Sequence, residues 1–162
     1  MMMMMMMMMM MMMMMMYKNS DSIMNKKHEL HMLAATHEID RIMVTEVLPK
    51  NYSIKPQNDD IKIKGYEVYS NLDKGNPGRG VAIYVSEKLS PFVTSLEVEG
   101  NFQEMVWISI RLRGKDKLAL GCLYRSPSSG NENHKELLQV MARVTEANPS
   151  HLVITGDFNY TN

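Results

Sequence analysis

Residues 151–159 read HLVITGDFN, a short apolar run followed directly by Gly-Asp-Phe-Asn. The short apolar run predicts a buried β-strand over about residues 151–155. Gly156 allows the backbone to bend tightly, and Asp157 then stands at the end of the strand. Asn159 follows two residues later, so in an extended segment both side chains lean toward the same face. The stretch therefore predicts a carboxylate and an amide at the end of a buried strand, although an ordinary Asx turn would explain the same residues.

A second carboxylate ends a second apolar strand. Residues 41–47 read RIMVTEV and predict a buried strand that carries Glu46 near its end. Hard divalent ions such as Mg²⁺ take oxygen ligands, often one or two carboxylates with water and substrate phosphate. We therefore expect Glu46 and Asp157 to lie close together and to frame a phosphoester-cleaving site. The alternative is that each acid only marks where a strand meets solvent.

The remaining sequence alternates strands with helical segments. Apolar residues at helical spacing predict helices over about residues 24–37 and 132–147. A short turn at residues 114–117 predicts an antiparallel hairpin. Strands that mix hairpins with helical crossovers predict an α/β (α+β) sandwich with mixed, largely antiparallel sheets. The further predicted strands cover about residues 66–69, 80–85, 106–112 and 118–124.

Composition limits the classes of function. Lys plus Arg and Asp plus Glu number 18 each in 162 residues, so the net charge is zero. Nucleic-acid binders are usually basic, so this balance argues against a large DNA-coating surface but leaves room for a local basic rim. Cys122 is the only cysteine, and the five histidines show no metal-ligand spacing with one another. The sequence therefore excludes an intrachain disulfide and a thiolate-rich zinc site.

The chain begins with an unbroken run of methionine at residues 1–16. The run lacks the basic region and cleavage site of a signal peptide, and it is short for a membrane span. It is either a low-complexity tail or an artefact of sequencing or gene prediction, and we favour the artefact. We therefore exclude residues 1–16 from the fold and assign residues 17–162 to one partial domain. We expect an intracellular protein, nuclear or cytoplasmic, with no membrane partner.

Six short motifs follow one another along the chain: YKNSDS at 17–22, NKKHEL at 25–30, VTE at 44–46, RGVAIYV at 79–85, LYRSP at 123–127 and GDFN at 156–159. Taken in this order, they resemble the endonuclease/exonuclease/phosphatase superfamily. The resemblance is closest to the endonucleases of non-LTR retrotransposons, which are similar to apurinic/apyrimidinic endonucleases. It implies a four-layer α/β sandwich, of which this chain holds about the first half to two-thirds.

The resemblance implies a role for each matching residue. Glu46 and Asn19 correspond to metal-binding positions, and the implied cofactor is Mg²⁺ or Mn²⁺. Asp157 corresponds to the aspartate that positions or activates the attacking water. The implied partner is DNA.

The same resemblance implies which residues contact the phosphate. Tyr124 corresponds to the active-site tyrosine, and Asn159 to an asparagine that acts in catalysis and contacts the phosphate. Asn19 and Arg125 are further phosphate-side candidates. The residues alone support this chemistry, since a phenol and an arginine can both bind phosphate oxygens. They are equally consistent with a rim tyrosine beside a solvated arginine.

The leading hypothesis is a partial Mg²⁺-dependent DNA endonuclease of the retroelement type. One alternative is a phosphatase or phosphodiesterase of the same superfamily, and another is an inactive remnant that only binds. The family also carries a further metal-side aspartate and a late Asp–His pair, which nothing in residues 17–162 matches. We therefore expect this chain alone to show no appreciable nuclease activity, because residues that act as one unit lose most of their effect when a member is removed.

Overall fold

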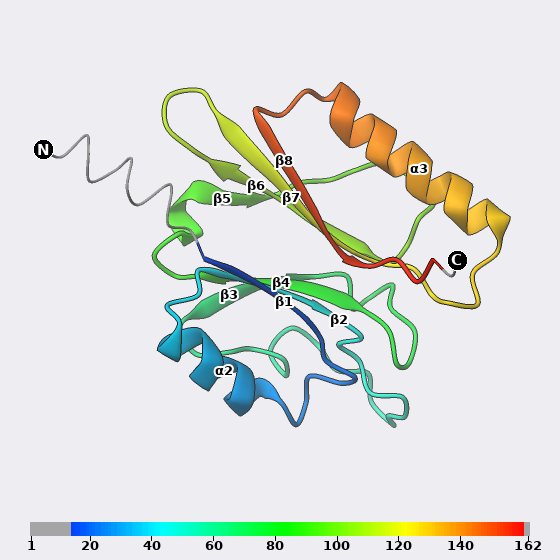
Figure 1. The fold of residues 1–162 in the computed structure, drawn as a ribbon. Helices are drawn as coiled ribbons and strands as arrows, with labels where there is room; N and C mark the ends of the chain where they lie inside the picture. The colour runs from blue at the N-terminus through cyan, green and yellow to red at the C-terminus, as the bar shows by residue number, and fades with distance from the viewer. Residues whose placement is uncertain (1–13, 161–162) are drawn as a thin grey trace, which may run out of the picture.

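Two four-stranded sheets pack face to face, and one helix covers the outer side of each (Figure 1). The computed structural model describes residues 14–160. The layers follow the order helix, sheet, sheet, helix, which confirms the expected α/β sandwich with mixed sheets. Residues 1–13, which make up most of the methionine run, lie outside the described residues.

The first sheet has the strand order β1-β2-β4-β3. Strand β1 runs parallel to β2, and the other two pairings are antiparallel. A parallel pair needs a long crossover, which α2 (Lys27–Thr36) supplies here. The strands are β1 (Met15–Asn19), β2 (Arg41–Thr45), β3 (Tyr66–Ser70) and β4 (Val81–Ser86).

The second sheet has the strand order β5-β6-β7-β8. The β6–β7 pair forms the predicted antiparallel hairpin, whereas β7 and β8 run parallel and are joined through α3 (Asn131–Glu146). A short 3₁₀ helix, η1 (Ser90–Phe92), precedes the first strand of this sheet. The strands are β5 (Val93–Ser95), β6 (Met105–Arg111), β7 (Lys117–Tyr124) and β8 (His151–Asp157).

Side-chain alternation along the strands divides the core into three clusters. On β2, Ile42 and Val44 pack toward α2, whereas Met43 packs toward the second sheet. On β7, Leu120 packs toward the first sheet and Leu123 toward α3. Successive strand residues point to opposite faces, so strands covered on both faces must be apolar at nearly every position. This explains the continuous apolar runs in the sequence.

Strand β1 begins inside the methionine run, two residues before the predicted domain start. Met16 packs against the core cluster beneath α2. The carbonyl of Met14 accepts hydrogen bonds from the backbone N–H groups of Asp40 at 3.0 Å and Arg41 at 3.2 Å. The last methionines therefore belong to the sheet, although a uniform run carries no pattern from which the strand could be predicted.

Several other element bounds differ from the predicted ones. Helix α2 spans Lys27–Thr36, so it is shorter than the predicted 24–37, and β2 ends at Thr45, before Glu46. Strand β8 extends to Asp157, two residues past its predicted end. Of the helices within residues 14–160, none has the length and apolar character that a bilayer crossing requires.

Close contact between β6 and β7 leads to a stability prediction. Gly121 lies opposite Trp107, and a Cβ atom at Gly121 would overlap the indole ring. Overpacking of this kind typically costs about 1–3 kcal/mol. We expect Gly121→Ala to lower the free energy of unfolding by that amount, measured by urea denaturation as a lower midpoint.

The matched control for this prediction is Gly130→Ala. An added Cβ at Gly130, the N-cap of α3, meets nothing within 4 Å. We expect a change within about 1 kcal/mol, since only an N-cap preference is altered. Equal destabilisation by the two substitutions would contradict the packing assigned to Gly121.

Candidate functional site

Four polar residues meet where β1, β2, β7 and β8 end. Asn19 is the last residue of β1 and pairs in register with Thr45, which precedes Glu46. Tyr124 is the last residue of β7 and pairs in register with Asp157, the last residue of β8. Parallel strands end at the same edge, so each pair of strands presents two side chains side by side.

Two hydrogen bonds connect these residues across the two sheets. The Tyr124 hydroxyl donates to Glu46 Oε1 at 3.0 Å. The Asn19 amide Nδ2 donates to Asp157 Oδ2 over a longer 3.4 Å. Each bond joins one residue of the first sheet to one of the second. The structure therefore brings together Asn19, Glu46, Tyr124 and Asp157.

Glu46 leaves its strand in a conformation that is rare for a residue with a side chain. Its φ is +54°, in the left-handed region. Its carbonyl accepts hydrogen bonds from Ser20 Oγ at 2.9 Å and from Ser22 N at 2.8 Å, and these bonds hold the turn. Left-handed non-glycine residues cost on the order of 1–3 kcal/mol and cluster at functional sites. The turn directs Glu46 toward Tyr124 instead of continuing β2.

Tyr124 is buried, with 6% of its surface exposed, and only its hydroxyl reaches the site. Burial raises the pKa of Tyr124 to about 12, and the hydrogen bond to Glu46 and the charge of that carboxylate act in the same direction. The nearby positive charge of Arg79 opposes the shift. Tyr124 is therefore a neutral hydrogen-bond donor at physiological pH.

Tyr17 is a neighbour of the site that the sequence analysis did not single out. Its hydroxyl lies 2.9 Å from Thr45 Oγ1, and burial raises its pKa. The charges of Asp157 and Glu46 add to that increase, so both carboxylates lie near this phenol. Tyr17 and Asn19 occupy alternate positions of β1 and so share a face, which is the signal that could have identified Tyr17.

Asn159 lies beside Asp157 but binds mainly to backbone. Its N–H donates to Asp157 Oδ1 at 3.2 Å, and its side-chain Nδ2 donates to the carbonyl of Arg125 at 2.7 Å. This is the Asx-type arrangement that was the alternative explanation. Glycine is required at position 156, directly before Asp157. The φ of Gly156 is +146°, and an added Cβ would strike the carbonyl of Leu123.

Arg125 also binds backbone in this arrangement. Its guanidinium donates to the carbonyls of Asn159 at 3.2 Å and Ser129 at 3.1 Å, with a longer 3.5 Å bond to that of Phe158. Its charge lies over the Tyr160 ring, 4.6 Å from the centroid. These contacts order the segment that carries Asp157. The phosphate-binding role expected for Arg125 stays a prediction that its contacts do not favour.

The oxygen atoms at this site suit a hard cation. Residues 14–160 contain no group of three or more His, Cys, Asp and Glu side chains that could hold a metal. Mg²⁺ is commonly held by one or two carboxylates, with waters and phosphate completing its shell. Glu46 with the Asn19 amide, beside Asp157, fits that description, whereas it does not fit a closed zinc site.

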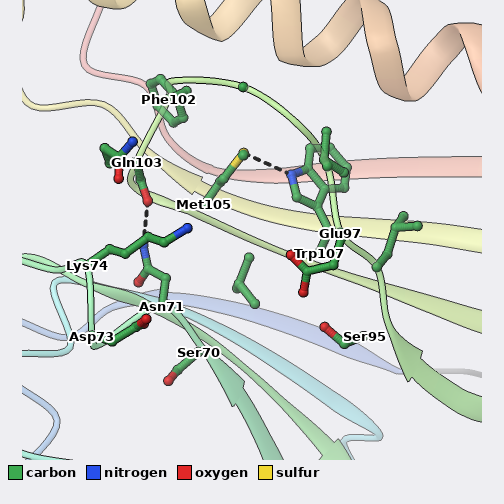
Figure 2. Close-up of a pocket in the computed structure, with 14 residues that line it drawn as sticks. Ser70, Asn71, Asp73, Lys74, Ser95, Glu97, Phe102, Gln103, Met105 and Trp107 are labelled. Atoms are coloured by element: carbon green, nitrogen blue, oxygen red, sulfur yellow. Dashed lines mark hydrogen bonds between the residues drawn. The ribbon is translucent and has the colours of Figure 1, made fainter.

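A cavity of about 250 Å³ lies apart from this site (Figure 2). It opens between the residues after β3 and those before β6, and its lining includes Lys74, Glu97 and Trp107. Asn71 is one of the residues that line it, and its Nδ2 donates to the carbonyl of Gln103 at 2.8 Å. None of the four site residues lines it, so the candidate site is not this cavity.

Solved structures share this fold. The chain matches D. rerio TDP2 in complex with a single-strand DNA product, with a TM-score of 0.60 and 16% identity over 91% of this chain and 60% of that one. The endonuclease domain of TRAS1, a telomere-specific non-LTR retrotransposon, gives 0.59 and 18% over 90% and 60%. A mannosyl-6-phosphatase of Bacteroides thetaiotaomicron gives 0.61 and 15% over 91% and 65%.

The chain spans 60–65% of the length of these three structures. No protein-family model matches the sequence. No curated protein matches it either. At these identities the likeness establishes the fold, and the four site residues have to be judged on their own geometry.

The environment of Tyr124 predicts a measurable titration. Subtracting the 295 nm absorbance of Tyr124→Phe from that of the wild type isolates the phenolate signal of Tyr124. This signal should titrate with a pKa of about 12. In Glu46→Gln this pKa should fall, because the substitution removes a negative charge beside the hydroxyl. Stopped-flow pH jumps allow the absorbance to be read before unfolding. A Tyr124 pKa near 10 in both the wild type and Glu46→Gln would contradict the hydrogen bond between Tyr124 and Glu46.

Proposed function

Since the chain has the endonuclease/exonuclease/phosphatase fold, we propose that it carries the phosphodiester-cleaving site of a divalent-metal-dependent hydrolase that acts on DNA. The observation that supports this proposal is the convergence of Asn19, Glu46, Tyr124 and Asp157 at one end of the sandwich. Two acids, an amide and a neutral phenol are the groups needed to bind a cation and a phosphate together.

Glu46 and Asn19 are the proposed holders of Mg²⁺ or Mn²⁺. Glu46 Oε1 accepts the Tyr124 hydrogen bond, and within residues 14–160 no group donates to Oε2. That oxygen is therefore open to a further ligand. When bound, the ion would supply Lewis-acid stabilisation of charge on a phosphoryl oxygen.

Asp157 is the proposed group that orients the attacking water. Its carboxylate is held by Asn159 N on Oδ1 and by Asn19 Nδ2 on Oδ2. A carboxylate fixed on both oxygens keeps a defined direction, which general-base action requires. Tyr124 would redirect its one O–H from Glu46 to a phosphate oxygen as charge develops there, since its proton is retained at neutral pH.

A phosphatase acting on phosphomonoesters is the second candidate function. The likeness to the mannosyl-6-phosphatase supports it, and so does the net charge of zero, since nucleic-acid binders are usually basic. Fold alone does not determine the substrate. Hydrolysis of phosphomonoesters but not of DNA would favour this candidate. A chain that binds metal and phosphate without hydrolysing either substrate would be a binding remnant.

Binding of Mn²⁺ tests the proposal independently of turnover. We expect the full chain to reduce the free Mn²⁺ signal in electron paramagnetic resonance titrations. Glu46→Gln should weaken that binding by at least ~10-fold, because it removes a charged ligand, and loss of even a supporting residue costs roughly 10–100-fold. Plasmid nicking in Mg²⁺ that is lost in Glu46→Gln would show in addition that these residues suffice for chemistry.

The control for this experiment is Glu67→Gln, which makes the same change of charge on an exposed residue of β3. We expect its Mn²⁺ affinity to equal that of the wild type. If Glu46→Gln and Glu67→Gln bind Mn²⁺ equally well, Glu46 is not a metal ligand and the proposed function fails.

A further inference from the structure

Arg79 is fixed beside the site by its backbone. It precedes β4, and its carbonyl accepts a hydrogen bond from Leu48 N at 2.8 Å. The next carbonyl, that of Gly80, accepts from Val47 N at 3.1 Å. Val47 and Leu48 directly follow Glu46, so Arg79 is tied to the turn that carries the proposed metal ligand.

The Arg79 side chain reaches from the first sheet to the second. Its Nη2 donates to Ser126 Oγ over 3.3 Å, two residues after Tyr124. Its positive charge acts on the Tyr124 hydroxyl and on the buried Glu104 carboxyl, lowering the pKa of each against the larger effect of burial. The guanidinium therefore lies close to the phenol that faces Glu46.

Most donors of the Arg79 guanidinium have no partner among residues 14–160. Arg79 makes one side-chain hydrogen bond there and no salt bridge. Glu104, the nearest buried acid, instead accepts from the backbone of Gly80 at 3.0 Å. A guanidinium carries five N–H donors, so the half-buried Arg79 retains both charge and donors for a ligand.

Arg125 at the same end differs in this respect. Its guanidinium binds backbone carbonyls and lies over the Tyr160 ring. Rearranging it would release the segment that carries Asp157. Of the two arginines, Arg79 is the one that can bind a ligand without such a cost.

We propose that Arg79 binds a phosphate group of the substrate, beside the position of Glu46 and Tyr124. The proposal rests on the proposed function and adds to it a residue that recognises the anionic backbone. The planar guanidinium can form two parallel hydrogen bonds to phosphate oxygens, and a charge already held on Ser126 loses little freedom on binding.

The test is binding of a fluorescein-labelled DNA oligonucleotide to the full chain, followed by anisotropy in EDTA and in Mg²⁺ over a range of salt concentrations. Arg79→Gln should weaken binding about 10-fold and reduce the slope of log K against log salt by about one. The control is Arg113→Gln, which removes the same charge from the exposed turn between β6 and β7, at the other end of β7 from Tyr124. It should change affinity less than about twofold.

The results distinguish failure of the role of Arg79 from failure of the proposed function. Equal binding by Arg79→Gln and wild type, or equal loss in Arg79→Gln and Arg113→Gln, would overturn the role of Arg79 and leave the proposed function standing. A wild-type chain that binds no oligonucleotide would overturn both. If Arg79→Gln loses the far-ultraviolet circular dichroism spectrum of the folded protein, the binding test is made with Arg79→Lys instead. Lysine cannot form the paired bonds, so binding at least about threefold weaker is expected and unchanged affinity would refute the proposal.

Discussion

The parallel pairing of β1 with β2 and of β7 with β8 determines where the helices and the polar site residues lie. A parallel pair cannot be closed by a tight turn, so each needs a crossover, and α2 and α3 provide these on the outer faces. The same pairing makes both strands of a pair end at one edge. Packing the two sheets together then places Asn19 and Glu46 opposite Tyr124 and Asp157.

The site combines strong burial with local strain. Tyr124 is packed in the core between the sheets, and Glu46 occupies a left-handed turn. Ser20 is fully buried, and its hydroxyl binds the carbonyl of Glu46. A strained turn and buried polar groups reduce stability locally unless many surrounding hydrogen bonds and packing contacts hold them. Preorganised sites are usually held in this way. Preorganisation allows the carboxylates and the phenol to meet a charged ligand with little rearrangement.

Much of this arrangement follows from sequence pattern, and the remainder depends on long-range contacts. The apolar run before Asp157 correctly predicts a strand, but β8 is only partly buried because it lies at the edge of its sheet. The family resemblance predicts the fold that the solved structures share. The pattern of alternation shows which side chains share a face, but not which strand lies next to which. A uniform methionine run carries no such pattern, so β1 could not be placed from the residues alone.

The arginines illustrate the same limit. Arg125 and Arg79 both stand in motifs of the resemblance, and nothing in the sequence indicates that the first binds carbonyls of the 157–160 segment. That bond joins residues 34 apart in the chain. Glu46 is comparable, because its departure from the strand is set by Ser20 and Ser22 on another segment. Contacts of this kind decide which side chains remain available to a ligand.

Residues from four strand ends are proposed to form one cation site at Glu46. Anomalous diffraction from crystals of the full chain soaked in Mn²⁺ can locate the bound ion. We expect a manganese peak within about 2.3 Å of a Glu46 carboxylate oxygen, close to the distance that hard divalent ions keep from oxygen ligands, with Asn19 and Asp157 beside it. A well-occupied manganese peak elsewhere, with none at Glu46, would rule out this cation site.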